Sequence, residues 1–181
     1  WHLETVTLPE GLTKLNAEVF NFCDNLSRIN WPKGLTSIGN KAFYNCTSLG
    51  TLTLSDAVTT IGESAFEYCI GLTRVTLPDE LVTLNNYAFS RCKSLKKVVF
   101  SDAVTTLGSS VFRECEALTD VQLPNSVTTI YSGAFYKCTS LTEMVLPDSI
   151  TSIYASAFQG CSGLQEVILS ENLTQIPSTC L

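Results

Sequence analysis

The feature that most constrains this chain is the interval from Cys23 to Cys46, which recurs without a slip along most of its length. A phenylalanine stands three residues before each cysteine of the series, and a leucine stands three residues after it. A fixed period of this size is the signature of one structural unit stacked on copies of itself, so the chain is predicted to be a solenoid. The cysteines that keep the spacing are Cys23, Cys46, Cys69, Cys92, Cys115, Cys138 and Cys161.

Each repeat begins with a segment in which apolar and polar residues alternate. In one copy, Val75 and Leu77 alternate with Arg74 and Thr76. This period of two predicts a half-buried strand. Pro78 follows at once, and because proline has no N–H group it ends the strand. The residues expected to face the interior from these first strands are Val6, Ile29, Leu52, Val75, Val98, Val121, Met144 and Val167.

The rest of the repeat contains two further segments. Residues 58–61 are rich in β-branched side chains, which favours a short second strand on another side of the coil. Ala65, Phe66 and Cys69 then stand at helical spacing. The segment is too short for an independent helix, so we expect one or two turns of α- or 3₁₀-helix on the outer side.

The repeats account for nearly the whole chain. Seven full copies cover residues 3–163, and a truncated eighth covers 164–181, so residues 1–181 are expected to form a single domain with a curved parallel sheet. Both ends cut through a repeat. We therefore expect the chain to be a fragment of a longer protein, and the uncapped ends allow end-to-end self-association.

The repeat also resembles a known family. The signature L-P-x-x-L-T-x-I-x-x-x-A-F-x-x-C-x-x-L stands clearly at residues 77–95, 123–141 and 146–164, and it is similar to the BspA-like type of leucine-rich repeat. The resemblance implies an α/β leucine-rich-repeat solenoid. Such repeats are familiar from surface-exposed or secreted proteins of bacteria and some protist parasites, where they are linked to adhesion and host-protein binding. It therefore implies a cell-surface or secreted scaffold with a host or matrix protein as partner.

Composition and residue types argue against several other functions. The net charge of −6 disfavours nucleic acid and anionic membrane surfaces as partners. No apolar run approaches the roughly 20 residues that span a bilayer, so membrane insertion is not expected. His2 is the only histidine, and the acidic pair Asp79 and Glu80 lies in a predicted bend. We therefore expect no catalytic residue, no metal site and no cofactor.

The cysteines allow two interpretations, a disulfide framework or a ladder of free thiols. Eight cysteines in a secreted chain could form a disulfide framework. Seven of them, however, occupy the same interior position, so their Cβ atoms would lie about 5 Å apart, beyond the usual disulfide range of about 3.5–4.5 Å. A buried free cysteine behaves as a small apolar residue, and a ladder of free thiols is the favoured reading.

Candidate binding residues stand at the outward positions of the first strands. Only positive charges occur there in the first five strands and only negative charges in the last three, and three positions are aliphatic. This pattern is either a solvated sheet face or a bipolar concave binding face. Tyr44, Tyr68 and Tyr136 on the outer turn form a second candidate patch. The candidates on the sheet are Arg28, Arg74, Lys97, Val99, Asp120, Gln122, Glu143, Val145, Glu166 and Ile168.

Two classes of function follow from these observations. In the first, the array is an extracellular recognition module whose concave face binds another protein. In the second, the array is a structural spacer or assembly element with no ligand of its own. Patterned outward positions favour the first class, whereas outward positions without a pattern favour the second.

Overall fold

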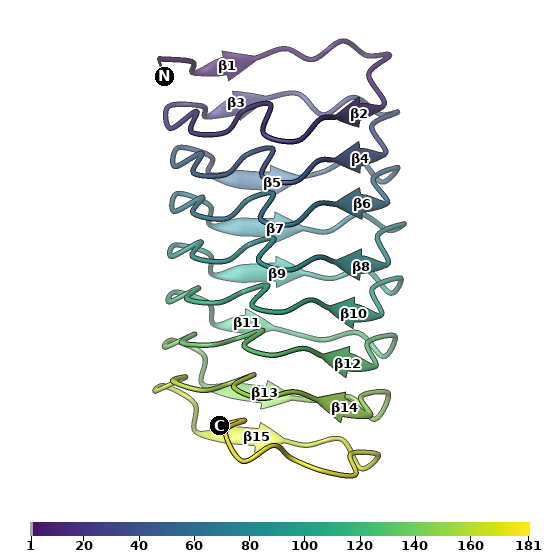
Figure 1. Cartoon of the computed structure of the whole chain (residues 1–181), viewed down its shortest axis with the longest axis vertical. Coiled ribbons are helices and arrows are strands. Elements are labelled where there is room, and N and C mark those ends of the chain that lie inside the picture. Colours follow the sequence, from purple (N-terminus) through teal and green to yellow (C-terminus); the bar gives the residue numbers. More distant parts are fainter. Residues whose placement is uncertain (1) are drawn as a thin grey trace.

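The computed structural model describes residues 2–181, and these form coils stacked along one long axis with the two termini at opposite ends (Figure 1). Every coil contributes strands of only two or three residues. The first strands of the coils are β1 (Thr5–Val6), β3 (Arg28–Ile29), β5 (Thr51–Thr53), β7 (Arg74–Thr76), β9 (Lys97–Val99), β11 (Asp120–Val121), β13 (Glu143–Val145) and β15 (Glu166–Ile168). The second strands are β2 (Lys14–Leu15), β4 (Ser37–Ile38), β6 (Thr60–Ile61), β8 (Thr83–Leu84), β10 (Thr106–Leu107), β12 (Thr129–Ile130) and β14 (Ser152–Ile153).

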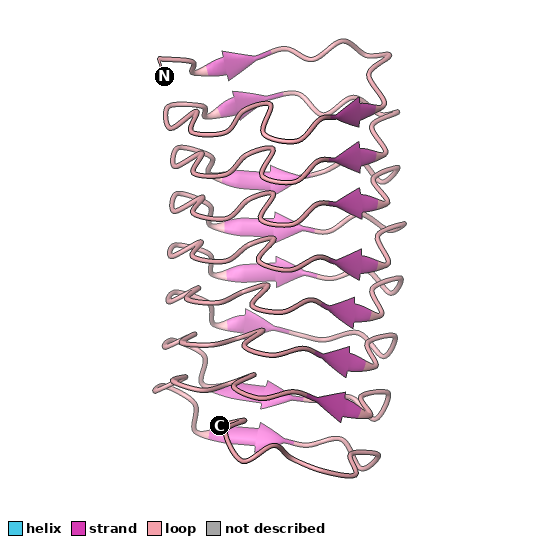
Figure 2. Cartoon of the chain, viewed as in Figure 1, coloured by secondary structure: helices cyan, strands magenta, loops and turns pink. Residues whose placement is uncertain are grey.

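The two series of strands pair differently. All pairs are parallel, and each joins residues one repeat apart, as in Val75 with Val98. The second strands form one continuous sheet of seven, from β2 to β14. The first strands form three separate sheets, β1–β3, β5–β7–β9–β11 and β13–β15, in place of the single sheet predicted. Figure 2 shows the two interruptions, between β3 and β5 and between β11 and β13, as the widest gaps between neighbouring first strands.

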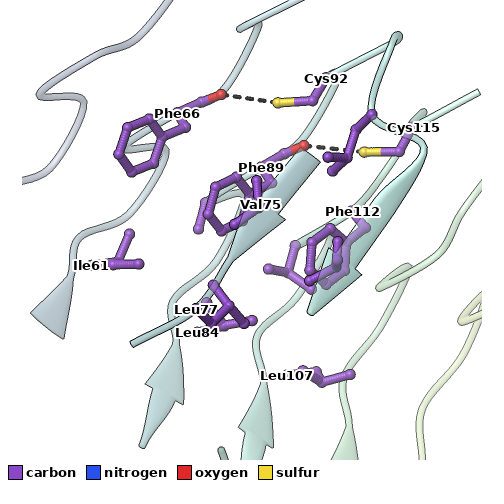
Figure 3. Close-up of a cluster of buried hydrophobic side chains, with 14 of the residues drawn as sticks. Ile61, Phe66, Val75, Leu77, Leu84, Phe89, Cys92, Leu107, Phe112 and Cys115 are labelled. Carbon is purple, nitrogen blue, oxygen red and sulfur yellow. Dashed lines mark hydrogen bonds between the residues drawn. The ribbon is translucent and has the colours of Figure 1, made fainter. Parts of the chain in front are cut away.

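The core contains a row of stacked phenylalanine side chains, one from each full repeat. Phe43, Phe66 and Phe89 are fully buried and stack with ring centroids 5.2 Å and 5.4 Å apart. Figure 3 shows how Phe66, Phe89 and Phe112 lie one behind another in the interior of the stack. The eight residues predicted to face inward from the first strands are all buried or half-buried against this core, which confirms their orientation.

The cysteines lie in the same core. The seven cysteines of the ladder are buried and free, as the favoured interpretation predicts, and Cys180 outside the ladder is also buried and free. Each thiol from Cys46 to Cys161 donates to the carbonyl of a phenylalanine in the preceding coil, for example Cys92 Sγ to Phe66 O at 3.2 Å (Figure 3). Burial raises the pKa of the Cys46 thiol to about 12, so the neutral thiol is the stable form at physiological pH.

The outer turns are not helical, and the predicted α- or 3₁₀-helical turns are wrong. Residues 2–181 contain strands, turns and loops only (Figure 2). The reason lies in the direction of alternate N–H groups. Phe43 N donates to Ala65 O of the next coil at 2.8 Å, whereas Tyr44 N donates to Lys41 O within its own coil at 3.1 Å. A helix would instead direct every N–H group along its own axis.

This alternation requires left-handed backbone at two positions of every full repeat. In one repeat, for example, Lys41 and Asn45 have φ of 53° and 58°. A non-glycine residue in this conformation costs about 1–2 kcal/mol, and the hydrogen bonds to the next coil offset that cost. The residues with positive φ are Glu18, Phe22, Lys41, Asn45, Ser64, Tyr68, Tyr87, Arg91, Ser110, Glu114, Gly133, Lys137, Ser156 and Gly160.

Candidate binding face

The outward side chains of the first strands, here called the first-strand face, include all ten candidates from the sequence. Each is exposed or half-buried. The parallel register brings them together in neighbouring coils, with Arg74 beside Lys97, Lys97 beside Asp120, and Glu143 beside Glu166. The repeat therefore places the predicted candidates on one surface.

The predicted change of sign on this face falls at an ion pair. Lys97 Nζ forms a salt bridge with a carboxylate oxygen of Asp120, and both side chains are about 40% exposed. Two of the candidate residues are thus already partners of each other. The other charged candidates lie on either side, at Arg28 and Arg74 in one half and at Glu143 and Glu166 in the other.

Each interruption of the first strands opens a groove. The β3–β5 groove has a volume of about 460 Å³ and includes Trp31, Lys33 and Asp56 in its lining. The β11–β13 groove has a volume of about 390 Å³ and is lined by Val121, Gln122, Leu123, Asn125, Glu143, Val145 and Pro147. A smaller recess of about 160 Å³ lies where β9 pairs with β11, so the two larger recesses of the face are those at the interruptions.

The β11–β13 groove partly uncovers the core. Val121 and Leu123 are half-buried there, whereas their equivalents Val98 and Leu77 are buried where the strands pair. Hydrogen bonds between coils show the same difference. Leu146 N donates to Ile168 O at 2.8 Å, but within residues 2–181 Leu123 N has no such bond to the coil of β13. The missing pairing leaves apolar side chains open to a partner.

Aliphatic side chains extend this groove onto the last two first strands. Val145 is 53% exposed and Ile168 is 50% exposed, and the two lie in register on β13 and β15. They alternate with Glu143 and Glu166 along the strands. Exposed aliphatic side chains that adjoin a recess are a common feature of protein-binding surfaces.

The second-strand wall is more uniform. Its outward positions from β4 to β14 are all threonine or serine. The threonine that precedes the strand commonly donates its hydroxyl to the preceding coil, as Thr36 Oγ1 does to Thr13 O at 3.0 Å. This wall offers little variation for the recognition of a specific partner.

The outer turns carry a network of charges and rings. Arg91 Nε donates to Glu114 Oε2 at 3.0 Å, and the Arg91 guanidinium lies 4.9 Å from the centroid of the Tyr68 ring. Tyr44 contacts Tyr68 edge to face at 5.4 Å, and Tyr136 lies under Arg113 at 4.4 Å. The three tyrosines of the predicted aromatic patch are therefore half-buried and engaged with their own neighbours.

The network also changes the acidity of its carboxylate. Burial raises the pKa of Glu114, but the hydrogen bonds and positive charges of Arg91 and Arg113 outweigh it, so the pKa lies below its ordinary value. The carboxylate form is therefore stabilised in the folded protein.

The ion pairs between neighbouring coils were not predicted from the sequence. The signal was available, because each of three acids stands one full repeat after its cation. The pairs are Arg91–Glu114 at 3.0 Å, Lys93–Glu116 at 2.9 Å, and Lys97–Asp120. Each of these basic residues thus lies beside an acidic residue of the following coil.

Other kinds of site are not indicated within residues 2–181. In that range, no group of three or more histidine, cysteine, aspartate or glutamate side chains is arranged to hold a metal ion. Asp79 and Glu80 are both exposed in the bend after β7.

Over the same range, no helix has both the length and the apolar character needed to cross a membrane.

The stacked coils of equal length, the phenylalanine and cysteine ladders and the parallel strands agree with a comparison against family models. The model described as "BspA type Leucine rich repeat region (6 copies)" matches residues 2–116 and 82–181. The chain belongs to this family. No curated protein matches the chain significantly.

Solved structures give the same result for this BspA-type array. The leucine rich repeat protein of T. pallidum (TpLRR) is 32% identical, with a TM-score of 0.82 over 89% of this chain and 78% of that one. A leucine-rich repeat protein of Eubacterium ventriosum is 30% identical, with a TM-score of 0.81 over 96% of this chain and 44% of that one. A leucine rich cell surface protein of Faecalibacterium prausnitzii is 27% identical, with a TM-score of 0.61 over 97% of this chain and 63% of that one.

Leucine-rich repeats of this kind are generally non-enzymatic scaffolds that take part in protein interactions.

Proposed function

We propose that this BspA-type array is a non-enzymatic protein-binding module that acts at the cell surface or after secretion, in adhesion or in recognition of a host or matrix protein. The first-strand face is the binding surface. The observation that carries this proposal is the contrast between the walls. The first-strand face has a groove at each interruption and varied side chains, whereas the second strands pair without a break and carry uniform side chains, with a cavity of about 340 Å³ beside the last of them, β14. The description of the Faecalibacterium relative as a cell surface protein supports the location.

The charges on the face define the general character of the partner. Arg28 and Arg74 lie on one side of the Lys97–Asp120 pair, and Glu143 and Glu166 lie on the other. A protein that covers the whole face therefore needs both signs of charge. Complementary charges of this kind increase the rate of association more than they increase affinity.

The test is capture of a partner from host or matrix extract by the wild-type chain, followed by association kinetics on charge-reversal variants. Arg74→Glu and Glu143→Lys change exposed residues in the two halves of the face. Glu63→Lys is the matched control, because Glu63 is exposed beside the outer turn. We expect both face variants to slow association by about tenfold at low salt, with a smaller effect at about 0.15 M salt.

The outcomes separate the two classes of function. Slower association for both face variants with an unchanged rate for Glu63→Lys supports recognition by the first-strand face. Equal losses for all three variants would contradict it. If no protein is captured, the alternative gains support, namely a structural spacer or assembly array with no ligand. The seven-stranded second-strand wall and the stacked phenylalanines suit such a rigid element.

We also propose that two copies of the array associate end to end. The last coil carries a cavity of about 500 Å³ whose lining includes Phe158, Leu164, Val167 and Leu181. Apolar side chains that line a recess favour contact with another apolar surface. Analytical ultracentrifugation tests this, since Leu164→Glu should convert a dimer to a monomer. A wild-type chain that is monomeric at all concentrations would contradict it.

A further inference from the structure

The β11–β13 groove and the two strands that follow it carry an unbalanced charge. Glu143 and Glu166 are Cα partners in adjacent parallel strands, which lie about 4.8 Å apart. Within residues 2–181 neither carboxylate has an ion pair, in contrast to Asp120, which is bound by Lys97. The sequence after Lys137 contains four acidic residues and no lysine or arginine. Like charges placed opposite each other destabilise a sheet, so a cation from another molecule would relieve this repulsion.

The apolar part of the same region has a matching geometry. Along β13 the outward residues are Glu143 and then Val145, two positions apart, and along β15 they are Glu166 and then Ile168. Residues two apart on an extended strand point to the same side and are separated by about 6.6–6.8 Å. An extended segment with a cation and an aliphatic residue two positions apart, and therefore on the same side, can contact a carboxylate and an aliphatic side chain together.

We propose that the β11–β13 groove, together with the outward residues of β13 and β15, binds an extended segment of a partner protein in which lysine or arginine stands two positions from an aliphatic residue, on the same side of the segment. The basic side chains pair with Glu143 and Glu166. The aliphatic side chains cover Val145 and Ile168 and enter the groove against Val121 and Leu123. This inference rests on the proposed function and names the chemistry of the partner at one end of the same face.

The β3–β5 groove provides an internal comparison. Its lining includes both Lys33 and Asp56, so its charges of opposite sign balance. A basic segment therefore has no electrostatic preference for that groove, although its volume is similar. The preference for a cationic partner is a property of the β11–β13 groove and not of both interruptions.

The test uses a fluorescein-labelled peptide of Lys-Ser-Val-Ser repeats, which places lysine and valine on the same side of an extended strand. Fluorescence anisotropy measures the binding of this lysine–valine peptide to the 181-residue chain. The double variant Glu143→Gln/Glu166→Gln removes both charges and keeps the side-chain shape. We expect it to weaken binding by about tenfold or more, and Val145→Ser to weaken binding by about threefold or more. The control Glu63→Gln/Glu80→Gln makes the same change in net charge at two exposed sites elsewhere and should leave binding unchanged.

Three results would overturn the inference. These are no binding of the peptide, equal binding of a peptide of Glu-Ser-Val-Ser repeats, and an equal loss of binding in the control variant. The last result would show that the peptide responds only to the overall negative charge. Thermal unfolding serves as a second measurement, since the glutamine variants should be folded and at least as stable as the wild type.

The inference and the proposed function can fail separately. If extract yields a partner whose association is slowed by Arg74→Glu while the lysine–valine peptide does not bind, the first-strand face is confirmed as the binding surface and the inference is wrong. If the peptide binds as predicted but no partner is captured, the groove chemistry holds and the proposed role in recognition loses support.

Discussion

The first and second strands of this array show how one repeat can build two unlike walls. Seven second strands pair without a break from β2 to β14, whereas eight first strands divide into groups of two, four and two. The outward residue of the second strand is threonine or serine in six of its seven copies. The outward residues of the first strand are basic, acidic, polar or aliphatic. The uniform wall joins the coils, and the interrupted wall carries the surface variation that recognition requires.

The interruptions are tolerated because other contacts still join the coils at those positions. At the β11–β13 step, Phe135 and Phe158 stack with centroids 5.5 Å apart. Phe135 N also donates to Ala157 O at 2.8 Å in the outer turns. Stability in such arrays comes mainly from contacts between neighbouring repeats, so two intact sides can hold a coil whose third side is open.

The largest expected effect comes from the core that both walls share. Phe89→Ala should destabilise the protein by about 3–5 kcal/mol, because the fully buried ring stacks on Phe66 and Phe112 and its removal leaves a cavity. Phe20→Ala should have a smaller effect, since Phe20 is half-buried and stacks on Phe43 alone. Urea unfolding measures both. Equal losses of unfolding free energy in the two variants would show that stability does not depend on the continuous stack of phenylalanine rings.

The second prediction compares the same residue type in a paired and an interrupted part of the first strands. Leu77→Ala should cost about 2–5 kcal/mol, because Leu77 is buried where β7 pairs with β9. Leu123→Ala should cost about 1–2 kcal/mol, because Leu123 is half-buried in the β11–β13 groove and loses less contact with the core. The free energy of unfolding of the two variants checks this. A larger loss for Leu123→Ala would mean that the groove is closed in solution.

The third prediction concerns the outer turns. Arg91→Met should reduce stability by about 0.5–1 kcal/mol at neutral pH, because Arg91 binds Glu114 and lies against the ring of Tyr68. The folded pKa of Glu114 is lowered, so this stabilisation is present above the unfolded pKa of about 4.3 and is lost as the pH falls through the folded value.

The measurement for this third prediction is the unfolding free energy of wild type and variant as a function of pH. The difference between the two proteins should shrink as the solution is acidified. A difference that stays constant down to the acid limit would show that Arg91 acts by packing alone.

The smallest effects should have opposite signs at two points on one face. Glu143→Gln should raise stability by about 0.2–1 kcal/mol, because it removes the repulsion from Glu166 in the adjacent strand. Lys97→Gln should lower stability by up to about 1 kcal/mol, because it removes the partner of Asp120. Differential scanning calorimetry at low and high salt distinguishes the two, and both effects should weaken as salt rises. A change in stability of the same sign for both variants would contradict the assignment of repulsion to Glu143 and attraction to Lys97.

The sequence predicts the interior of this protein well and its turns poorly. The fixed spacing specifies which residues face inward, because every coil must present the same side chains to close the core, as Val75 and Val98 do. The turn segment has helical spacing, but its shape depends on hydrogen bonds to the neighbouring coil, which are remote in sequence. The left-handed backbone at residues such as Lys41 and Arg91, where glycine would be expected, carries no local signal, whereas Asn45, Gly133 and Gly160 are of types that adopt it more readily.

The candidate face was predicted as the outward side of one sheet, but its interruptions and grooves were not predicted. The ten residues do lie on one side, because strands in register bring equivalent positions of successive repeats together. The interruption beside β13 could not be foreseen, since Asp120-Val121 has the same alternating pattern as the paired strands. The pairing of Lys97 with Asp120 was predictable from their spacing, and it shows that charges in such arrays must be read across repeats as well as along them.

Amide hydrogen exchange tests most directly the claim that the first-strand face at the β11–β13 interruption is the binding surface. In the free protein, residues 103–108 should exchange slowly, because Thr105 N and Gly108 N donate to the preceding coil at 2.9 Å and 2.8 Å. Leu123 and Thr142 should exchange faster, because within residues 2–181 no hydrogen bond joins their N–H groups to the coil across the interruption. The bound lysine–valine peptide should slow exchange there. Slow exchange across the interruption in the free protein, or peptide protection on the second-strand wall instead, would contradict the account.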